Sequence, residues 1–224
     1  MRTRRAPGRF FTFEGLDGCG KTTQIQLLAD YLKSQRIPHL VTREPGGTRL
    51  GERIRQVLLP RASRGMDPRT EVLLYFAARA QNVAENILPA LAAGRVVLCD
   101  RFTDASLAYQ GYGRGLDLTF IRQLHRVACQ GLHPHLTFVL DINPHTCVRR
   151  ARRRNTAARF DEGRFEEEAL AFHQRVRRGY RALACQEPRR VKLIPGEDSI
   201  ESVHRKIVDL VRPLLGIKDK GKRR

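Results

Sequence analysis

Short runs of apolar residues alternate with longer stretches in which apolar residues recur every three or four positions, and this alternation extends over almost the whole chain. The short runs have the length of β-strands and predict strands over residues 10–13, 39–42, 96–99, 136–140 and 191–194. The longer stretches predict helices over residues 21–34, 50–59, 70–93, 118–130, 144–154, 166–184 and 200–215. Pro89 is expected to bend or end part of the third helix.

The runs over 96–99 and 136–140 are almost entirely apolar, which is typical of strands buried on both faces of a parallel sheet. Strands that alternate with helices form such a sheet between two helical layers. No internal repeat or linker divides the chain, so the sequence predicts a single three-layer α/β domain with a five-stranded parallel sheet over residues 10–215. Ligands of these domains bind beyond the carboxyl ends of the strands. The segments at these ends are residues 15–20, Glu44, Asp100, Arg101 and Asp141.

The chain of 224 residues has 42 basic and 23 acidic side chains, and its net charge of +19 could by itself indicate nucleic-acid binding. The basic tails at 1–9 and 216–224 hold nine of the basic residues and one acid, so nearly half of the excess lies in segments expected to be frayed. A further six arginines and no acid lie between 149 and 159. This block is either a solvated helix face or a clamp for an anion.

The composition excludes other classes. No apolar run exceeds seven residues, whereas a membrane-spanning helix needs about 18 or more. The first residues lack the apolar core of a signal peptide, so we expect a cytoplasmic protein. Five cysteines are too scattered for a metal knuckle or a disulfide framework and are expected to be reduced thiols.

A glycine-rich segment between a predicted strand and a predicted helix carries the clearest chemistry. Residues 15–22 match G-x-x-x-x-G-K-[ST], in which backbone N–H groups and the helix N-terminus surround phosphate oxygens. Lys21 would reach the outer phosphates and Thr22 would bind Mg²⁺. The alternative is a glycine-rich turn that only caps the helix. The residues predicted to bind the nucleotide phosphates are Gly15, Leu16, Asp17, Gly18, Cys19, Gly20, Lys21 and Thr22.

The end of the strand over 96–99 supplies two more candidates. Asp100 fits the second acid of such sites, which holds the metal or its waters, although an Asp at a strand end can also be a turn residue. The neighbouring Arg101 could bind a second phosphate through two parallel hydrogen bonds. The chain lacks an Asn/Thr-Lys-x-Asp guanine signature and is too short for a typical helicase core. The arginines of 149–159 lie where a small kinase would place a lid over ATP.

Four motifs in order give the chain a resemblance to a known family. They are Phe13 to Thr23 (FEGLDGCGKTT), Thr42 to Thr48 (TREPGGT), Asp100 to Phe102 (DRF) and Ala108 to Gly115 (AYQGYGRG). With them the chain resembles thymidylate kinase, of the P-loop nucleoside monophosphate kinase group, from about Phe10 to Leu215. The resemblance implies transfer of the γ-phosphoryl group of ATP to dTMP with Mg²⁺, a step of dTTP synthesis, by a homodimer with the P-loop kinase fold. It implies neither a membrane nor a specific nucleic acid as a partner.

The same resemblance assigns the substrate residues. Tyr75 falls where the family stacks an aromatic ring on thymine, and Arg79, one helical turn later, falls where it hydrogen-bonds the base. Tyr109 matches the ring that fills the space of a ribose 2′-hydroxyl and so selects deoxyribose. The remaining matches are Arg55 and Arg101 at the dTMP phosphate, Glu44 and Pro45 in the loop that shapes the pocket, and Ser106 and Gln110 beside the base.

Catalysis is expected to rest on charge and position, because the attacking phosphate oxygen of dTMP is already anionic and needs no general base. Lys21, Asp17, Arg101 and Arg159 are the expected catalytic residues. Asp17 matches a carboxylate that contacts either the sugar 3′-hydroxyl or metal waters.

The chain departs from the family pattern at two positions. Gly18 stands where the eukaryotic type has an Arg, so the chain resembles the bacterial type, in which a lid at about 149–165 supplies the cation. Arg159 is the best candidate for that cation, with Arg153 and Arg154 as alternatives. Ala105 replaces a Ser that is frequent in the family.

Other functions are less well supported. Another deoxynucleotide or deoxynucleoside kinase would share the phosphate loop, but Tyr75, Arg79, Tyr109 and Gln110 argue against it. A nucleic-acid-stimulated ATPase is suggested only by the net charge, which the lid partly explains.

Overall fold

The computed structural model describes residues 8–156 and 163–217, with side chains up to residue 153 in the first range. Among these residues, five strands form one sheet in the order β2-β3-β1-β4-β5, and every neighbouring pair is parallel. The strands are β1 (Arg9–Glu14), β2 (His39–Arg43), β3 (Val96–Asp100), β4 (Leu136–Asp141) and β5 (Val191–Pro195). The predicted α/β class with a five-stranded parallel sheet is confirmed.

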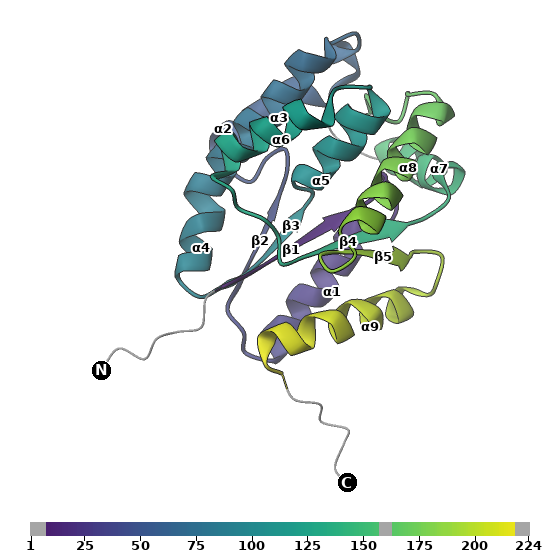
Figure 1. Ribbon diagram of the computed structural model, residues 1–224. Coiled ribbons are helices and arrows are strands. Elements are labelled where there is room, and N and C mark those ends of the chain that lie inside the picture. The colour runs from purple at the N-terminus through teal and green to yellow at the C-terminus, as the bar shows by residue number, and fades with distance from the viewer. Residues whose placement is uncertain (1–7, 157–162, 218–224) are drawn as a thin grey trace.

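Helices cover both faces of this sheet (Figure 1). The helices α1 and α9 lie against one face, and α3, α5 and α6 lie over the other. The α-helices are α1 (Lys21–Ser34), α2 (Arg49–Leu58), α3 (Pro68–Asn82), α4 (Leu88–Ala92), α5 (Thr103–Ser106), α6 (Leu118–Cys129), α7 (Pro144–Thr156), α8 (Leu170–Gln186) and α9 (Ile200–Val211). Helical segments of other types are the 3₁₀ turns η1 (Arg61–Ser63) and η4 (Arg212–Leu215) and the π-helical segments η2 (Val83–Ile87) and η3 (Leu107–Gly113).

The core lies on both faces of the central strand. In β1 the side chains of Phe11 and Phe13 enter the larger apolar cluster, while Phe10 enters a second cluster with residues of β3 and η2. All three rings are fully buried, and burial of a Phe side chain contributes about 1.5–3 kcal/mol to stability. This packing fixes the end of β1 at Glu14, where the phosphate loop begins.

Most predicted elements agree with the structure to within two residues, and the helix predicted over 21–34 agrees at both ends. The helix predicted over 70–93 is interrupted by the π-helical turn η2, and Pro89 is the second residue of α4, which continues directly from η2. The helix predicted over 166–184 begins only at Leu170. Residue Arg9, predicted to belong to the N-terminal tail, is the first residue of β1.

The helical segment formed by α5 and η3 was not predicted. Its glycines, Gly111 and Gly113, resemble a loop in sequence, but they allow close packing of the segment. A Cβ atom at Gly111 would lie 2.3 Å from Leu118, and one at Gly113 would lie 2.7 Å from Phe172. The segment therefore packs against α6 and α8 in a way that local pattern does not reveal.

The described helices are all too short or too polar to cross a membrane. All five cysteines lie in the described ranges and are free thiols, as predicted.

Candidate active site

The phosphate loop connects β1 to α1. Gly15, Gly18 and Gly20 have φ angles of 130°, 81° and 97°, which residues with a Cβ rarely adopt. Gly20 precedes the first turn of α1, so the free N–H groups of that turn point toward the loop. The buried Lys21 extends back over the loop, where its Nζ donates to the carbonyl of Leu16 at 3.1 Å. This geometry is that of a binding site for phosphate oxygens.

The loop packs directly on α7. A Cβ atom at Gly18 would lie 2.4 Å from the carbonyl oxygen of Cys147 and 3.0 Å from the backbone nitrogen of Ala151. Backbone atoms cannot move aside as a flexible side chain can. The position that carries an Arg in the eukaryotic type therefore has no room for a side chain here, and α7, which contains five of the six arginines of 149–159, lies against the loop.

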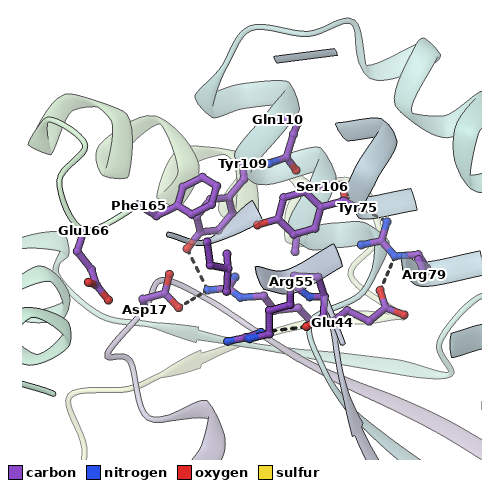
Figure 2. Close-up of a pocket in the computed structure, with 14 residues that line it drawn as sticks. Asp17, Glu44, Arg55, Tyr75, Arg79, Ser106, Tyr109, Gln110, Phe165 and Glu166 are labelled. Carbon is purple, nitrogen blue, oxygen red and sulfur yellow. Dashed lines mark hydrogen bonds and ion pairs between the residues drawn. The ribbon is translucent and has the colours of Figure 1, made fainter. Parts of the chain in front are cut away.

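All nine residues predicted to bind dTMP line one pocket beside this loop (Figure 2). The structure thus brings together residues from α2, α3, α5, η3, the loop after β2 and the turn after β3. The lining consists of Asp17, Glu44, Pro45, Arg55, Leu59, Tyr75, Arg79, Arg101, Ala105, Ser106, Tyr109, Gln110, Phe165 and Glu166.

Arg101 lies between the phosphate loop and the pocket. Its Nη2 donates to Asp17 Oδ1 at 2.7 Å and to the hydroxyl of Tyr109 at 3.1 Å. Its guanidinium also lies 4.8 Å from the centre of the Tyr109 ring, within cation–π range. Arg101 is therefore placed so that it can bridge an anion in the pocket and the phosphate loop.

Glu14, the last residue of β1, holds the neighbours of Arg101 in place through hydrogen bonds. Its carboxylate accepts hydrogen bonds from the backbone N–H of Phe102 at 2.8 Å and from the hydroxyl of Tyr180 at 2.8 Å. Tyr180 in turn accepts from Nη1 of Arg101 at 3.3 Å. Complete burial, assisted by the charge of Asp104, raises the pKa of Glu14 to about 8.

A buried ion pair forms one wall of the pocket. Arg79 Nε donates to Glu44 Oε2 at 2.5 Å, and both residues are at most 4% exposed. The same guanidinium donates to Ser106 Oγ at 3.1 Å and to the carbonyl of Phe102 at 3.0 Å. Three of its five N–H groups therefore bind protein, which leaves two for a ligand.

The loop after β2 forms a second wall. The Glu44–Pro45 peptide bond is cis, and Arg55 Nη1 donates to the carbonyl oxygen of Pro45 at 2.9 Å. Tyr75 lies one turn before Arg79 on α3, and burial raises the pKa of its phenol, which therefore stays neutral.

Three residues that line the pocket were missed from the sequence, because no motif marks them. These are Leu59, Phe165 and Glu166. The Phe165 ring meets the Tyr109 ring edge-on at 5.5 Å between centres. Tyr180 was missed because it comes from α8, far from Arg101 in sequence. Glu14 lies within the first family motif, which was the one signal that could have drawn attention to it.

The residues predicted to hold a metal lie at the same edge of the sheet. Thr22 is exposed in the first turn of α1, and Asp100 is partly exposed at the end of β3. In the part of the chain that the structure describes, no three His, Cys, Asp or Glu residues cluster as a metal cage. This donor set fits Mg²⁺, which takes one or two protein ligands and completes its shell with water and phosphate oxygens.

The arginines predicted to supply the cation of the lid lie at the end of α7 or after it. Arg159 lies outside the described residues, as does the side chain of Arg154. Arg153 is exposed near the end of α7 and lines a groove with Arg149 and Arg152.

A phosphate loop on a parallel sheet, beside a deep pocket lined by arginines and tyrosines, defines a P-loop kinase that acts on a nucleoside monophosphate. Comparison with known proteins narrows this class. The family model for thymidylate kinase matches residues 13–207, and the chain belongs to the thymidylate kinase family.

Individual relatives agree over nearly the whole chain. A thymidylate kinase of Syntrophotalea carbinolica is 51% identical over 199 residues, which are 88% of this chain and 92% of the relative. A thymidylate kinase of Desulfovibrio desulfuricans is 52% identical over 196 residues, covering 87% and 90%. The crystal structure of thymidylate kinase from Ehrlichia chaffeensis superimposes with a TM-score of 0.75 at 32% identity, covering 92% of this chain and all of that one.

Proposed function

We propose that this enzyme transfers the γ-phosphoryl group of ATP to dTMP, which yields dTDP and ADP. The observation that carries the proposal is the pocket beside the phosphate loop, whose lining includes every residue predicted to bind dTMP. Membership of the thymidylate kinase family supports the same substrates. Another nucleotide kinase would share the loop but would not need this pocket lining.

The donor phosphates bind at the loop between β1 and α1. Backbone N–H groups of residues 15–22 surround the phosphate oxygens, and Lys21 moves from its loop carbonyl partners to the outer phosphates. When bound, Mg²⁺ neutralises phosphate charge, with Thr22 and Asp100 as the residues that hold it or its waters.

The acceptor binds in the pocket with its base against Tyr75 and its phosphate toward the loop. Arg55 and Arg101 bind that phosphate, a task suited to the planar guanidinium. Tyr109 is packed among other aromatic rings and held by Arg101, so its ring is a rigid barrier against a ribose 2′-hydroxyl. Arg79 and Gln110 contact the base. Asp17 contacts the sugar 3′-hydroxyl or metal waters.

Charge and position drive the transfer. The acceptor oxygen is anionic already, so the site needs to hold two phosphates in line and neutralise them. Lys21, Arg101 and Arg159 of the lid, at about 149–165, supply the positive charge. The Asp17–Arg101 ion pair, at 2.7 Å, holds Arg101 at the border of the two phosphate sites.

We propose a homodimer formed through α2, α3 and α6. The helix α3 packs between the other two, as Figure 1 shows, and exposes Leu73 at 50%. Its neighbours expose Val57 on α2 at 50% and Val127 on α6 at 83%, so large apolar side chains gather on these three helices. Leu73→Arg should shift the protein from dimer to monomer in sedimentation, and a monomeric unaltered protein would contradict the proposal.

The free cysteines fit a reducing compartment, and we place the enzyme in the cytoplasm.

The experiment that tests the function measures ADP release with ATP and Mg²⁺. Each reaction contains one of dTMP, dUMP, UMP, dCMP, dGMP, AMP, thymidine and single-stranded DNA. We expect dTMP to give the highest kcat/KM, with dUMP second. If another nucleotide gives the highest kcat/KM, the assignment of the phosphate loop stands and the assignment of the dTMP pocket is wrong. ADP release that only DNA stimulates would favour a nucleic-acid-stimulated ATPase.

A further inference from the structure

A buried carboxylate lies behind the pocket without lining it. Glu71 on α3 is fully buried, and its Oε2 accepts from Arg164 Nη1 at 2.6 Å. Arg114 donates to both carboxylate oxygens at 3.3–3.4 Å. The fourth group in this cluster is neutral: Gln110 Nε2 donates to Glu71 Oε1 at 2.7 Å. Two guanidinium groups and the amide of Gln110 thus all donate to the Glu71 carboxylate.

This contact decides the orientation of the Gln110 amide. The two ends of an amide have nearly the same shape, and only its hydrogen-bond partners decide which end faces which side. A carboxylate accepts hydrogen bonds and donates none, so the NH₂ group must face Glu71. The amide oxygen is then the end left for the pocket that Gln110 lines. Figure 2 shows Gln110 on the same side of this pocket as the Tyr75 ring.

A fixed acceptor distinguishes pyrimidines by their N3 atom. N3 of thymine or uracil carries a hydrogen and donates, whereas N3 of cytosine is an acceptor. An acceptor in the pocket therefore pairs with the first two bases and faces an unpaired lone pair in the third. Mismatched polar groups in a buried site discriminate strongly, because neither group recovers the water that it has lost.

We propose that Glu71 is a positioning residue that sets base specificity. It holds the Gln110 amide with its oxygen toward the pocket, so that the site favours a pyrimidine whose N3 carries a hydrogen over cytosine. The inference rests on the proposed function, because it takes a pyrimidine monophosphate as the ligand. Glu71 acts through Gln110 and does not touch the substrate.

The test compares kcat/KM for dCMP and dTMP in Glu71→Gln. A glutamine at position 71 can accept or donate, so the Gln110 amide is free to turn and present its NH₂ group to N3 of cytosine. We expect the dCMP/dTMP ratio of kcat/KM to rise about tenfold or more, mainly through KM. The control is Arg164→Gln, which weakens the same buried cluster but leaves Glu71 to orient Gln110. Its ratio should stay within about threefold of the unaltered enzyme.

The double variant Glu71→Gln, Gln110→Glu separates orientation from folding. Here the NH₂ group of residue 71 donates to the carboxylate at 110, which again offers only acceptors to the pocket. We expect the double variant to return the dCMP/dTMP ratio to within about threefold of its original value. Equal losses on both nucleotides in Glu71→Gln, a ratio that also rises in Arg164→Gln, or no return in the double variant would each overturn the proposal. If the unaltered enzyme does not phosphorylate dTMP, the proposed function itself is wrong.

Discussion

At the residue scale, the turn after β3 shows how the fold places the side chain of Arg101, a predicted catalytic residue. Arg101 has a φ angle of 70°, a left-handed conformation that costs a residue with a Cβ about 1–2 kcal/mol. Two residues of β1 offset this strain. The N–H of Arg101 donates to the carbonyl of Phe13 at 3.0 Å, and the N–H of the next residue, Phe102, donates to the Glu14 carboxylate. The strained turn is thus held on both sides, and it directs the guanidinium toward the phosphate loop.

The buried carboxyl that supports this turn should make stability depend on pH. Because the pKa of Glu14 is raised from 4.5 to about 8 in the folded protein, the folded state binds one more proton than the unfolded state between these values. The contribution of Glu14 to stability is then fully present below about pH 4.5 and is lost as pH rises toward 8. Glu14→Gln keeps the hydrogen-bonding shape without the charge. Its melting temperature relative to the unaltered protein should rise steadily from pH 5 to pH 8.

Calorimetry at several pH values measures this difference, with the exposed Glu201→Gln as control. The control should follow the unaltered protein throughout. Curves for Glu14→Gln and the unaltered protein that stay parallel from pH 5 to 8 would contradict the raised pKa.

At the element scale, the phosphate loop and α7 form one unit. Backbone atoms of α7 lie where a Cβ of residue 18 would be, so the phosphate loop is in direct contact with α7, which carries five of the six arginines of 149–159. We infer that this contact fixes the position of α7 relative to the loop.

Gly18→Ala should therefore weaken ATP binding and lower stability more than replacement of a glycine that has free space around it. We expect KM for ATP to rise about tenfold or more and stability to fall by about 2–4 kcal/mol, from backbone strain and overpacking together. The matched control is Gly65→Ala, where φ is 84° but a Cβ would meet nothing within 4 Å. The control should lose about 1–2 kcal/mol and keep its KM for ATP. Equal effects of the two substitutions would show that α7 does not press on the loop.

The elements also show what sequence can predict. The first four residues of β3 are buried and apolar, so this strand is evident from pattern. The helical segment over 107–113 is not evident, because its glycines allow close packing with side chains of other helices. Likewise, the family resemblance selected nine residues that line one pocket, whereas Phe165 and Glu71 depend on tertiary contacts that no local signal encodes.

At the scale of the whole molecule, buried ion pairs tie several arginines into the fold. Arg79, Arg164 and Arg190 pair with the carboxylates of Glu44, Glu71 and Asp104, and each of these pairs is largely buried. These arginines fix the pocket wall, the cluster behind it and the base of the sheet. The net charge of +19 already counts both partners of each pair, and nearly half of it comes from the tails at 1–9 and 216–224.

The most direct test of the whole account is a competition assay with the unaltered enzyme. An equimolar mixture of dTMP, dUMP, dCMP and UMP is incubated with ATP and Mg²⁺, and the diphosphates are separated by chromatography at early times. We expect dTDP to form first and one ADP to appear for each diphosphate. Initial formation of another diphosphate, or ADP release without any diphosphate, would contradict it.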